Sequence, residues 1–198
     1  MENQAVALVS AVSPNHWLKR YYFVRFAVSA VWVAVAFTVA QGAPALAAVM
    51  LVAYPAWDAL ANAVDARQSG GLIRNKSQLL NFVVSVLTAL AVAIALTQSM
   101  NAVLAVFGVW AVLSGLFQLA TGVTRWKSYG AQWAMILSGA QSALAGVFFV
   151  KMASGPMAAS ILNVAPYAAF GAFYFLVSAV WLTVNDARRS SLGASASL

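Results

Sequence analysis

The sequence predicts an all-α, polytopic membrane protein with six transmembrane helices, arranged as three helical hairpins, with both termini in the cytoplasm. Two observations carry this prediction. The chain is 63% hydrophobic and 8% charged, with a mean hydropathy of +0.84, whereas a soluble domain is roughly half apolar and about a quarter charged. The basic residues also gather in every second connector between the apolar stretches, and this pattern indicates an orientation in the membrane.

Six stretches of the chain have the length and apolar character of a membrane span, which needs about 20 such residues. Residues 1–21 are expected to form a cytoplasmic or interfacial lead-in, with Ser13 as N-cap and Pro14 at the first helical position. Residues 22–189 then form the transmembrane domain, and the small, polar residues 190–198 form a disordered tail. The six spans run roughly over 22–40, 44–64, 78–97, 101–123, 132–152 and 163–184.

The connectors alternate in charge. Of the eleven Lys and Arg residues, ten flank connectors on one side, and Lys151 alone lies on the other. An excess of Lys and Arg in short connectors marks the cytoplasmic face, and an even number of spans agrees with two cytoplasmic termini. The ten are Lys19, Arg20, Arg25, Arg67, Arg74, Lys76, Arg125, Lys127, Arg188 and Arg189.

An internal repeat is indicated by spacing. Moving span four onto span six by 63 positions superimposes Gly108 on Gly171 and Arg125 on Arg188. We therefore expect three in–out–in hairpins over 18–67, 77–127 and 131–189, packed about a pseudo-symmetry axis. The alternative is chance similarity between Ala- and Gly-rich helices, because apolar spans align easily on small residues.

Small residues recur on spans four and five at helical spacing. Helices in a bilayer associate where small side chains let their backbones approach, so these faces are expected to be interhelical seams. The residues are Gly108, Gly115 and Gly122 on span four, and Ser138, Gly139, Ser142 and Gly146 on span five.

Asp58 is the most costly residue in the predicted spans. A carboxylate at a helix centre raises the free energy of membrane insertion by roughly 2.5–3.5 kcal/mol. The six large aliphatic residues of span two lower it by only about 2–4 kcal/mol. Arg25, on the neighbouring span one, lies at a depth from which its long side chain can reach Asp58. Tyr54, Asp58 and Asn62 share one helix face, which must point into the bundle.

Two interpretations of Asp58 remain open from the sequence. In one, an ion pair with Arg25 fixes helix packing; in the other, Asp58 is a protonatable group in a cavity, together with Arg25, Tyr54 and Asn62. Pro55 is expected to kink the helix, because it removes the hydrogen bond to the carbonyl of Leu51.

Several classes of function and ligand are excluded by what the sequence contains. With no cysteine and a single histidine, no metal site or cofactor is expected. The basic residues form no stripe, so nucleic acid is not a partner, and no catalytic motif is present, so we expect no enzyme.

Asn81, Gln118 and Gln141 are expected to form interhelical hydrogen bonds. Trp110, Trp133 and Trp181 are expected to face lipid or the headgroup belt.

The segments "GVWAVLSGLFQLATGVTR" (108–125) and "WAMILSGAQSALAGVFF" (133–149) resemble the HdeD-like acid-resistance membrane proteins, a family with short repeats of unknown function. The resemblance covers about 100–189, and the second span departs from it at Pro55 and Asp58. It implies six spans, a bacterial inner-membrane location and a role in acid stress, and it implies no catalytic residue.

Three classes of function follow: a non-enzymatic stress protein of the HdeD-like type, a small proton- or cation-responsive transporter or channel that uses Asp58, and an assembly partner of another membrane protein. The lipid bilayer is the expected environment in each. A second copy of the chain or another membrane protein is left open as a partner. Flux into liposomes separates the second class from the others, and a stoichiometric co-purifying partner favours the third.

The orientation can be tested with cysteine substitutions, because the chain has no cysteine of its own. In intact cells, a membrane-impermeant maleimide should label Lys151→Cys and should label Arg67→Cys only after the membrane is permeabilised. Labelling of Arg67→Cys from outside would contradict the predicted orientation.

Overall fold

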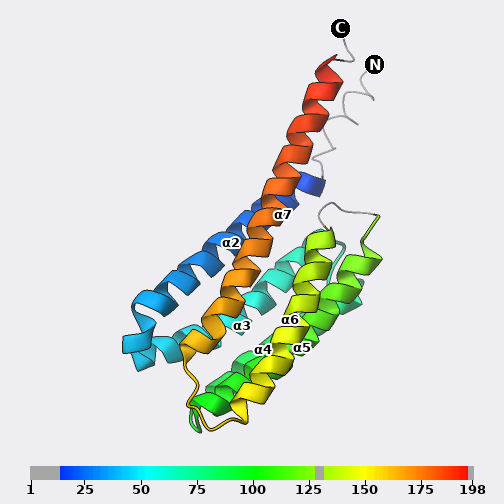
Figure 1. The fold of residues 1–198 in the computed structure, drawn as a ribbon. Coiled ribbons are helices and arrows are strands. Elements are labelled where there is room, and N and C mark those ends of the chain that lie inside the picture. Colours follow the sequence, from blue (N-terminus) through cyan, green and yellow to red (C-terminus); the bar gives the residue numbers. More distant parts are fainter. Residues whose placement is uncertain (1–13, 128–131, 196–198) are drawn as a thin grey trace.

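The computed structural model describes residues 14–127 and 132–195, which fold as six long helices joined by short connectors (Figure 1). All six are long and apolar enough to cross a bilayer, so the six predicted spans are confirmed. The helices are α2 (Pro14–Thr38), α3 (Pro44–Gln68), α4 (Lys76–Ala95), α5 (Met100–Thr124), α6 (Gln132–Ala153) and α7 (Ile161–Ser195), with a 3-10 turn, η1 (Ala40–Gly42), between the first two.

The boundaries differ from the sequence prediction at both ends. The expected interfacial segment is continuous with the first span, because α2 begins at Pro14 and runs unbroken to Thr38; residues 1–13 lie outside the described residues. At the other end α7 continues to Ser195, so the part of the expected disordered tail over 190–195 is helical. No proline follows Arg189 to stop the helix, and residues 196–198 lie outside the described residues.

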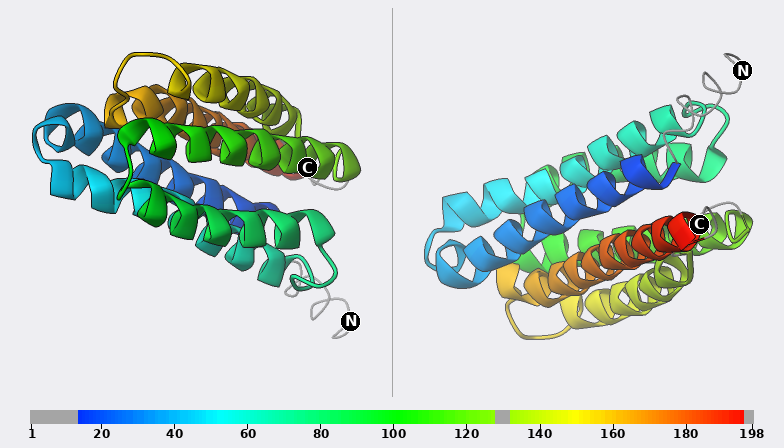
Figure 2. Two further views of the ribbon diagram at one scale, coloured as in Figure 1. Left: turned by 90° about the horizontal axis from the view of Figure 1, so that it is seen from below. Right: turned by 90° about the horizontal axis from the view of Figure 1, so that it is seen from above.

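The helices form a ring in chain order, which α7 closes by packing on α2. In the right-hand view of Figure 2, α2 and α7 lie in front, α3 and α6 lie on the flanks, and α4 and α5 lie behind. The contacts around this ring are uneven. They are extensive between α2 and α7 and along the series α3–α4–α5–α6, and sparse between α2 and α3 and between α6 and α7. The bundle therefore consists of a terminal pair, α2 and α7, set against a four-helix unit, α3–α6.

The helices of the three predicted hairpins differ in how closely they pack. Of the three predicted pairs, only α4 and α5 pack closely, and the other two pairs are the loosest seams of the ring. A short connector fixes only the ends of two helices, whereas close approach along their length needs small side chains at the contact. Helices α2 and α3 are joined instead by separate polar contacts along their length, which are Trp32 to Met50, the Arg25–Asp58 pair and Tyr21 to Ala61.

The terminal pair is held together by apolar and charged contacts. Leu18 and Tyr22 of α2 pack with Ala179 and Leu182 of α7 in a small buried cluster. Beside this cluster the Nζ atom of Lys19 lies 2.7 Å from a carboxylate oxygen of Asp186. These contacts lie at the end of the bundle where α2 begins and α7 ends (Figure 1). We call this the basic end, because the connector 69–75 and residues 125–127, which carry Arg74, Arg125 and Lys127, lie there too.

The seam between α5 and α6 is built on the glycines that the sequence singled out. A methyl group at Gly115 would lie 2.5 Å from the carbonyl oxygen of Gly139, and one at Gly108 would lie 2.9 Å from that of Gly146. Gly122 is less tightly packed, since a methyl group there would lie 2.8 Å from the Ile136 side chain and at least 3.4 Å from the backbone of α6. The two backbones are therefore in direct contact, which only glycine at these positions permits.

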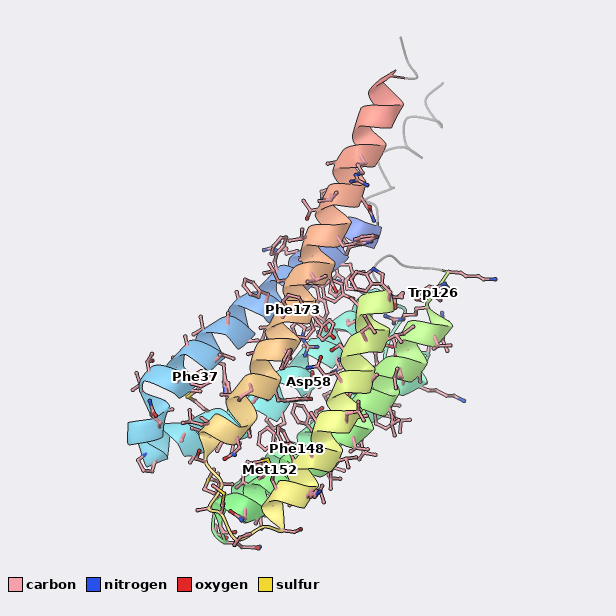
Figure 3. The ribbon with its side chains drawn as sticks, in the orientation of Figure 1. Phe37, Asp58, Trp126, Phe148, Met152 and Phe173 are labelled. Atoms are coloured by element: carbon pink, nitrogen blue, oxygen red, sulfur yellow. The ribbon has the colours of Figure 1, made fainter. Side chains whose placement is uncertain are left out.

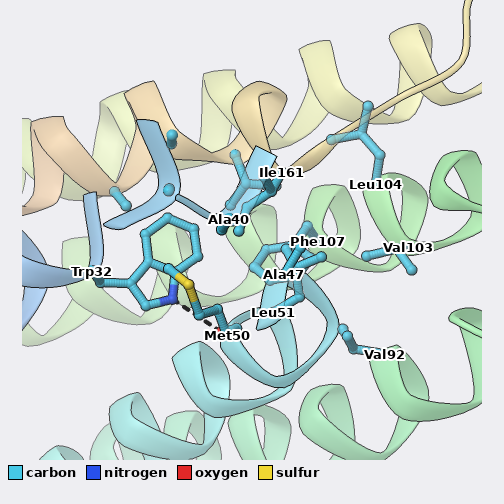
Figure 4. Close-up of a cluster of buried hydrophobic side chains, with 14 of the residues drawn as sticks. Trp32, Ala40, Ala47, Met50, Leu51, Val92, Val103, Leu104, Phe107 and Ile161 are labelled. Atoms are coloured by element: carbon cyan, nitrogen blue, oxygen red, sulfur yellow. Dashed lines mark hydrogen bonds between the residues drawn. The ribbon is translucent and has the colours of Figure 1, made fainter. Parts of the chain in front are cut away.

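The end of the bundle opposite the basic end is filled by an apolar core (Figure 4). Leu51, Val92, Val103 and Phe107 are fully buried there. The indole Nε1 of Trp32 donates to the carbonyl oxygen of Met50 at 3.0 Å, which ties α2 to α3. The outer faces carry exposed aliphatic and aromatic side chains, as a lipid environment requires.

Replacing Gly115 by alanine should push α5 and α6 apart, because the added methyl group meets backbone atoms that cannot turn away. We expect a loss of about 1–3 kcal/mol in the free energy of unfolding, measured by denaturant titration in detergent micelles. Gly42→Ala is the matched control, since no atom lies within 4 Å of the position of its methyl group. Equal losses in the two variants would contradict the close seam.

Candidate functional site

Asp58 lies in the middle of the bundle, between the basic end and the apolar core (Figure 3). It belongs to α3, faces the interior of the ring, and is 8% exposed. A carboxylate so far from water needs partners for its charge and its lone pairs. Helices α2 and α4 supply polar groups to it directly, and α5 does so through Ser85.

The carboxylate of Asp58 is surrounded by hydrogen-bond donors. One oxygen, Oδ1, accepts from Nη2 of Arg25 on α2 and forms a buried ion pair with it. The other, Oδ2, accepts from Nδ2 of Asn62 at 2.9 Å, from Oγ of Ser85 at 2.9 Å and, more weakly, from Nδ2 of Asn81 at 3.5 Å. The ionised form of the carboxylate is thus fully satisfied.

Arg25 is held in place by groups on three helices. Its Nη1 donates to the hydroxyl of Tyr21 at 3.1 Å, and that hydroxyl lies 3.3 Å from the carbonyl oxygen of Ala61 on α3. The centre of its guanidinium lies 4.3 Å from the ring centroid of Phe175 on α7, a cation–π contact. The Arg25–Asp58 pair therefore joins the terminal pair to the four-helix unit across the loose seam.

A polar cavity of about 460 Å³ leads from the basic end toward this pair. We call it the vestibule. It reaches the protein surface at exposed Gln68, and Asp65 lies on its wall, paired with Arg125 at 3.3 Å and accepting a hydrogen bond from Gln78. Deeper in, its lining includes Arg25, Asn62 and Asn81, which are partners of Asp58.

A second, smaller cavity of about 50 Å³ lies beyond the vestibule and contains Asp58 in its wall. We call it the inner chamber. The two cavities share four lining residues, which mark the constriction between them: Arg25, Asn81, Gln118 and Phe175. The chamber lies between the terminal pair and the four-helix unit, and both supply its walls. The polar groups of α5 and α6 that face it are Ser114, Gln118, Ser138, Gln141 and Ser142.

Aromatic rings close the inner chamber on the side of the apolar core. The ring of Tyr54 lies 5.7 Å from that of Trp110, which lies 6.3 Å from that of Tyr167. The hydroxyl of Tyr167 pairs with Oγ of Ser142 at 2.8 Å, and this Oγ also donates to the carbonyl oxygen of Ala111. These rings lie between Asp58 and the apolar core.

The predicted site residues separate into two groups. Asp58, Arg25 and Asn62 form one hydrogen-bonded cluster, whereas Tyr54 lies in the aromatic layer and makes no hydrogen bond to Asp58 that the structure records. Pro55 is fully buried inside α3, and the helix continues through it to Gln68. Of the predicted packing residues on α6, Ser138 and Ser142 line the chamber, while Gly139 and Gly146 form the seam with α5.

The sequence did not identify Ser85 and Trp110 as site residues. The prediction that Trp110 faces lipid is wrong: it is 3% exposed, and its indole Nε1 donates to Oγ of Ser85 at 3.0 Å, which in turn donates to Asp58. Tryptophan is common at lipid interfaces, and its sequence position alone does not reveal a buried acceptor. Ser85 and Asn81 lie four residues apart on α4, so they share a helix face, and this spacing was the available signal.

This arrangement can hold a proton, an ion or water at one carboxylate, because a single titratable acid lies at the end of a polar path. Among residues 14–127 and 132–195, no group of three or more His, Cys, Asp or Glu side chains is placed to hold a metal ion.

Residues 83–151 match the model of a family described as a short repeat of unknown function (DUF308). The match covers 69 of the 198 residues and spans most of α4, all of α5 and most of α6. It supports the short-repeat assignment for this part of the chain. No curated protein and no solved structure matches the chain.

Replacing Arg25 by methionine should cost about 3–5 kcal/mol in the free energy of unfolding at neutral pH, because it leaves a buried carboxylate without its counter-charge. Adding Asp58→Asn to this variant should recover most of the loss. The two single variants and the double variant form a double-mutant cycle, read by denaturant titration in micelles.

Lys19→Met is the control for this cycle, since it breaks an ion pair with Asp186 that is more exposed than the Arg25–Asp58 pair and should cost less than Arg25→Met. Additive effects of Arg25→Met and Asp58→Asn would show that the buried pair is not an energetic unit.

Proposed function

We propose that this multi-pass membrane protein is a small proton-responsive transporter, in which Asp58 binds and releases a proton supplied through the vestibule. The observation that carries the proposal is the pair of polar cavities in series, which end at a buried carboxylate and are closed beyond it by aromatic and apolar side chains. Ionisable groups inside membrane bundles commonly mark proton or substrate paths, because their insertion is costly.

A proton suits Asp58 better than a metal cation. Both carboxylate oxygens already accept hydrogen bonds, and Arg25 places a positive charge against Oδ1. A cation would have to displace Arg25 and would be repelled by it. A proton needs no coordination shell, and it neutralises the carboxylate where it lies.

The division of the bundle gives protonation a mechanical consequence. The Arg25–Asp58 pair bridges the seam where contacts between α2 and α3 are sparse. Neutralising Asp58 removes the Coulomb attraction across this seam and leaves the terminal pair held there by weaker contacts. Rocking of one helical unit against another around a central site is how many small transporters alternate access.

Acid stress is the setting that we propose for this activity. The HdeD-like resemblance of 108–125 and 133–149 supports it, as does the short-repeat match over 83–151. We further propose a bacterial inner-membrane location, with the basic end in the cytoplasm and no enzymatic activity. Reduced survival of a deletion strain at low external pH, restored by the wild-type chain, is the expected result.

Purified protein in liposomes should move protons across the membrane when a pH gradient is imposed, as read by an entrapped pH-sensitive dye. Asp58→Asn should lower this rate at least tenfold, after the rate in empty liposomes has been subtracted, because it removes the titrating group. Asp186→Asn is the matched control, since Asp186 pairs with Lys19 and lines neither cavity. Equal rates in wild type and Asp58→Asn would refute the proposal.

A further inference from the structure

Four buried polar atoms without a hydrogen-bond partner belong to residues that line the inner chamber. They are Nε of Arg25, Nε1 of Trp57, Oδ1 of Asn81 and Oγ of Ser114. Arg25, Asn81 and Ser114 are each at least nine-tenths buried. A buried polar group without a partner costs about 1–3 kcal/mol, so four around one small space indicate that something is bound there.

The size of the chamber restricts the ligand. Its volume of about 50 Å³ is room for one or two species the size of water, each of which takes about 30 Å³ in the liquid. Water or a small ion fits within the chamber itself, whereas a sugar or an amino acid would also extend into the vestibule.

The chemistry of the four atoms favours a negative ligand. The N–H groups of arginine Nε and tryptophan Nε1 are donors only, and the hydroxyl of Ser114 can donate. The amide of Asn81 offers either its oxygen or its nitrogen, because the two ends interchange by a half-turn. A cation would face two groups that can only donate.

The charge in the chamber depends on Asp58. While Asp58 is ionised, it neutralises Arg25 and repels an anion; once Asp58 is protonated, the guanidinium is left without a counter-charge. We propose that the inner chamber binds one small monovalent anion, of the size of chloride, nitrate or formate, when Asp58 is protonated. The proposal rests on the proposed function for the role of Asp58 as proton acceptor and names the ligand that accompanies the proton.

The step balances in charge and atoms. The Asp58 carboxylate gains one proton from a hydronium ion in the vestibule, whose O–H bond breaks and which becomes water, and the guanidinium of Arg25 exchanges the carboxylate for the anion. One O–H bond is broken and one is formed. Proton and anion enter together, so the net charge of the chamber is unchanged.

Other titratable groups lie around Asp58 in the two cavities. They are Tyr21 on α2, Tyr54 on α3, Tyr167 and Tyr174 on α7, and the vestibule pair of Asp65 on α3 with Arg125 on α5. From α4 and α6 come only neutral amides and hydroxyls, such as Asn81 and Ser138.

The test is anion-dependent thermal stability of the full chain in detergent, at constant ionic strength, with chloride, nitrate or formate compared with gluconate, which is too large for the chamber. At pH 5 the small anions should raise Tm and gluconate should not. The apparent affinity should fall about tenfold per pH unit where Asp58 is ionised, because one proton is taken up with each anion. Asp58→Asn should bind the anion at pH 5 and pH 7.5 alike.

Two further variants keep the test informative if Asp58→Asn folds poorly. Trp57→Phe and Ser114→Ala each remove one donor and should each weaken the anion effect about tenfold at pH 5, whereas Asp186→Asn should behave as wild type. Equal stabilisation by gluconate, dependence on the cation instead of the anion, or no effect of any small anion would overturn the proposal and leave the chamber as a water site.

The outcomes also separate this proposal from the proposed function. Proton flux in liposomes without anion-dependent stabilisation would reject the anion site and keep the transporter. Anion binding coupled to pH, without any flux, would keep the site and reject transport.

Discussion

The buried ion pair between Arg25 and Asp58 is the interaction on which the arrangement of this bundle depends. It joins the terminal pair, α2 and α7, to the four-helix unit at a seam with few other contacts. In a bilayer neither charge can turn to water, so each requires the other while both are ionised. Asn62 and Ser85 donate hydrogen bonds to the carboxylate. Tyr21 accepts a hydrogen bond from the guanidinium, and the ring of Phe175 makes a cation–π contact with it.

The two kinds of seam in the ring have different physical origins. Between α5 and α6, glycines let the backbones touch, and such a contact gains dispersion energy along its whole length. Between α2 and α3 there are no glycines, and an ion pair replaces close packing at mid-depth. A packed seam is rigid under all conditions, whereas a seam held by charge responds to protonation. This difference places the responsive part of the molecule around the two cavities.

The polarity of the interior changes sharply along the axis of the bundle. Polar groups from α3, α4, α5 and α6 surround the vestibule and the inner chamber, and the aromatic layer of Tyr54, Trp110 and Tyr167 separates them from a core without charged groups. The polar lining therefore extends from the basic end as far as Asp58 and not into the apolar core. Asp58 lies at this boundary, where a change in its charge has the largest electrostatic effect.

The sequence by itself determined the six spans, because hydropathy is a local property and each span carries its own signal. It also indicated the glycines of the α5–α6 seam and the cost of Asp58, since both follow from residue type and helical spacing. Only the tertiary structure decided which helices pack closely: α2 packs more extensively on α7 than on α3, and Trp110 reaches Ser85 instead of lipid. The physical reason is that ring closure and cavities depend on contacts between residues far apart in the chain, and the period of a single helix says which face is polar but not what lies opposite it.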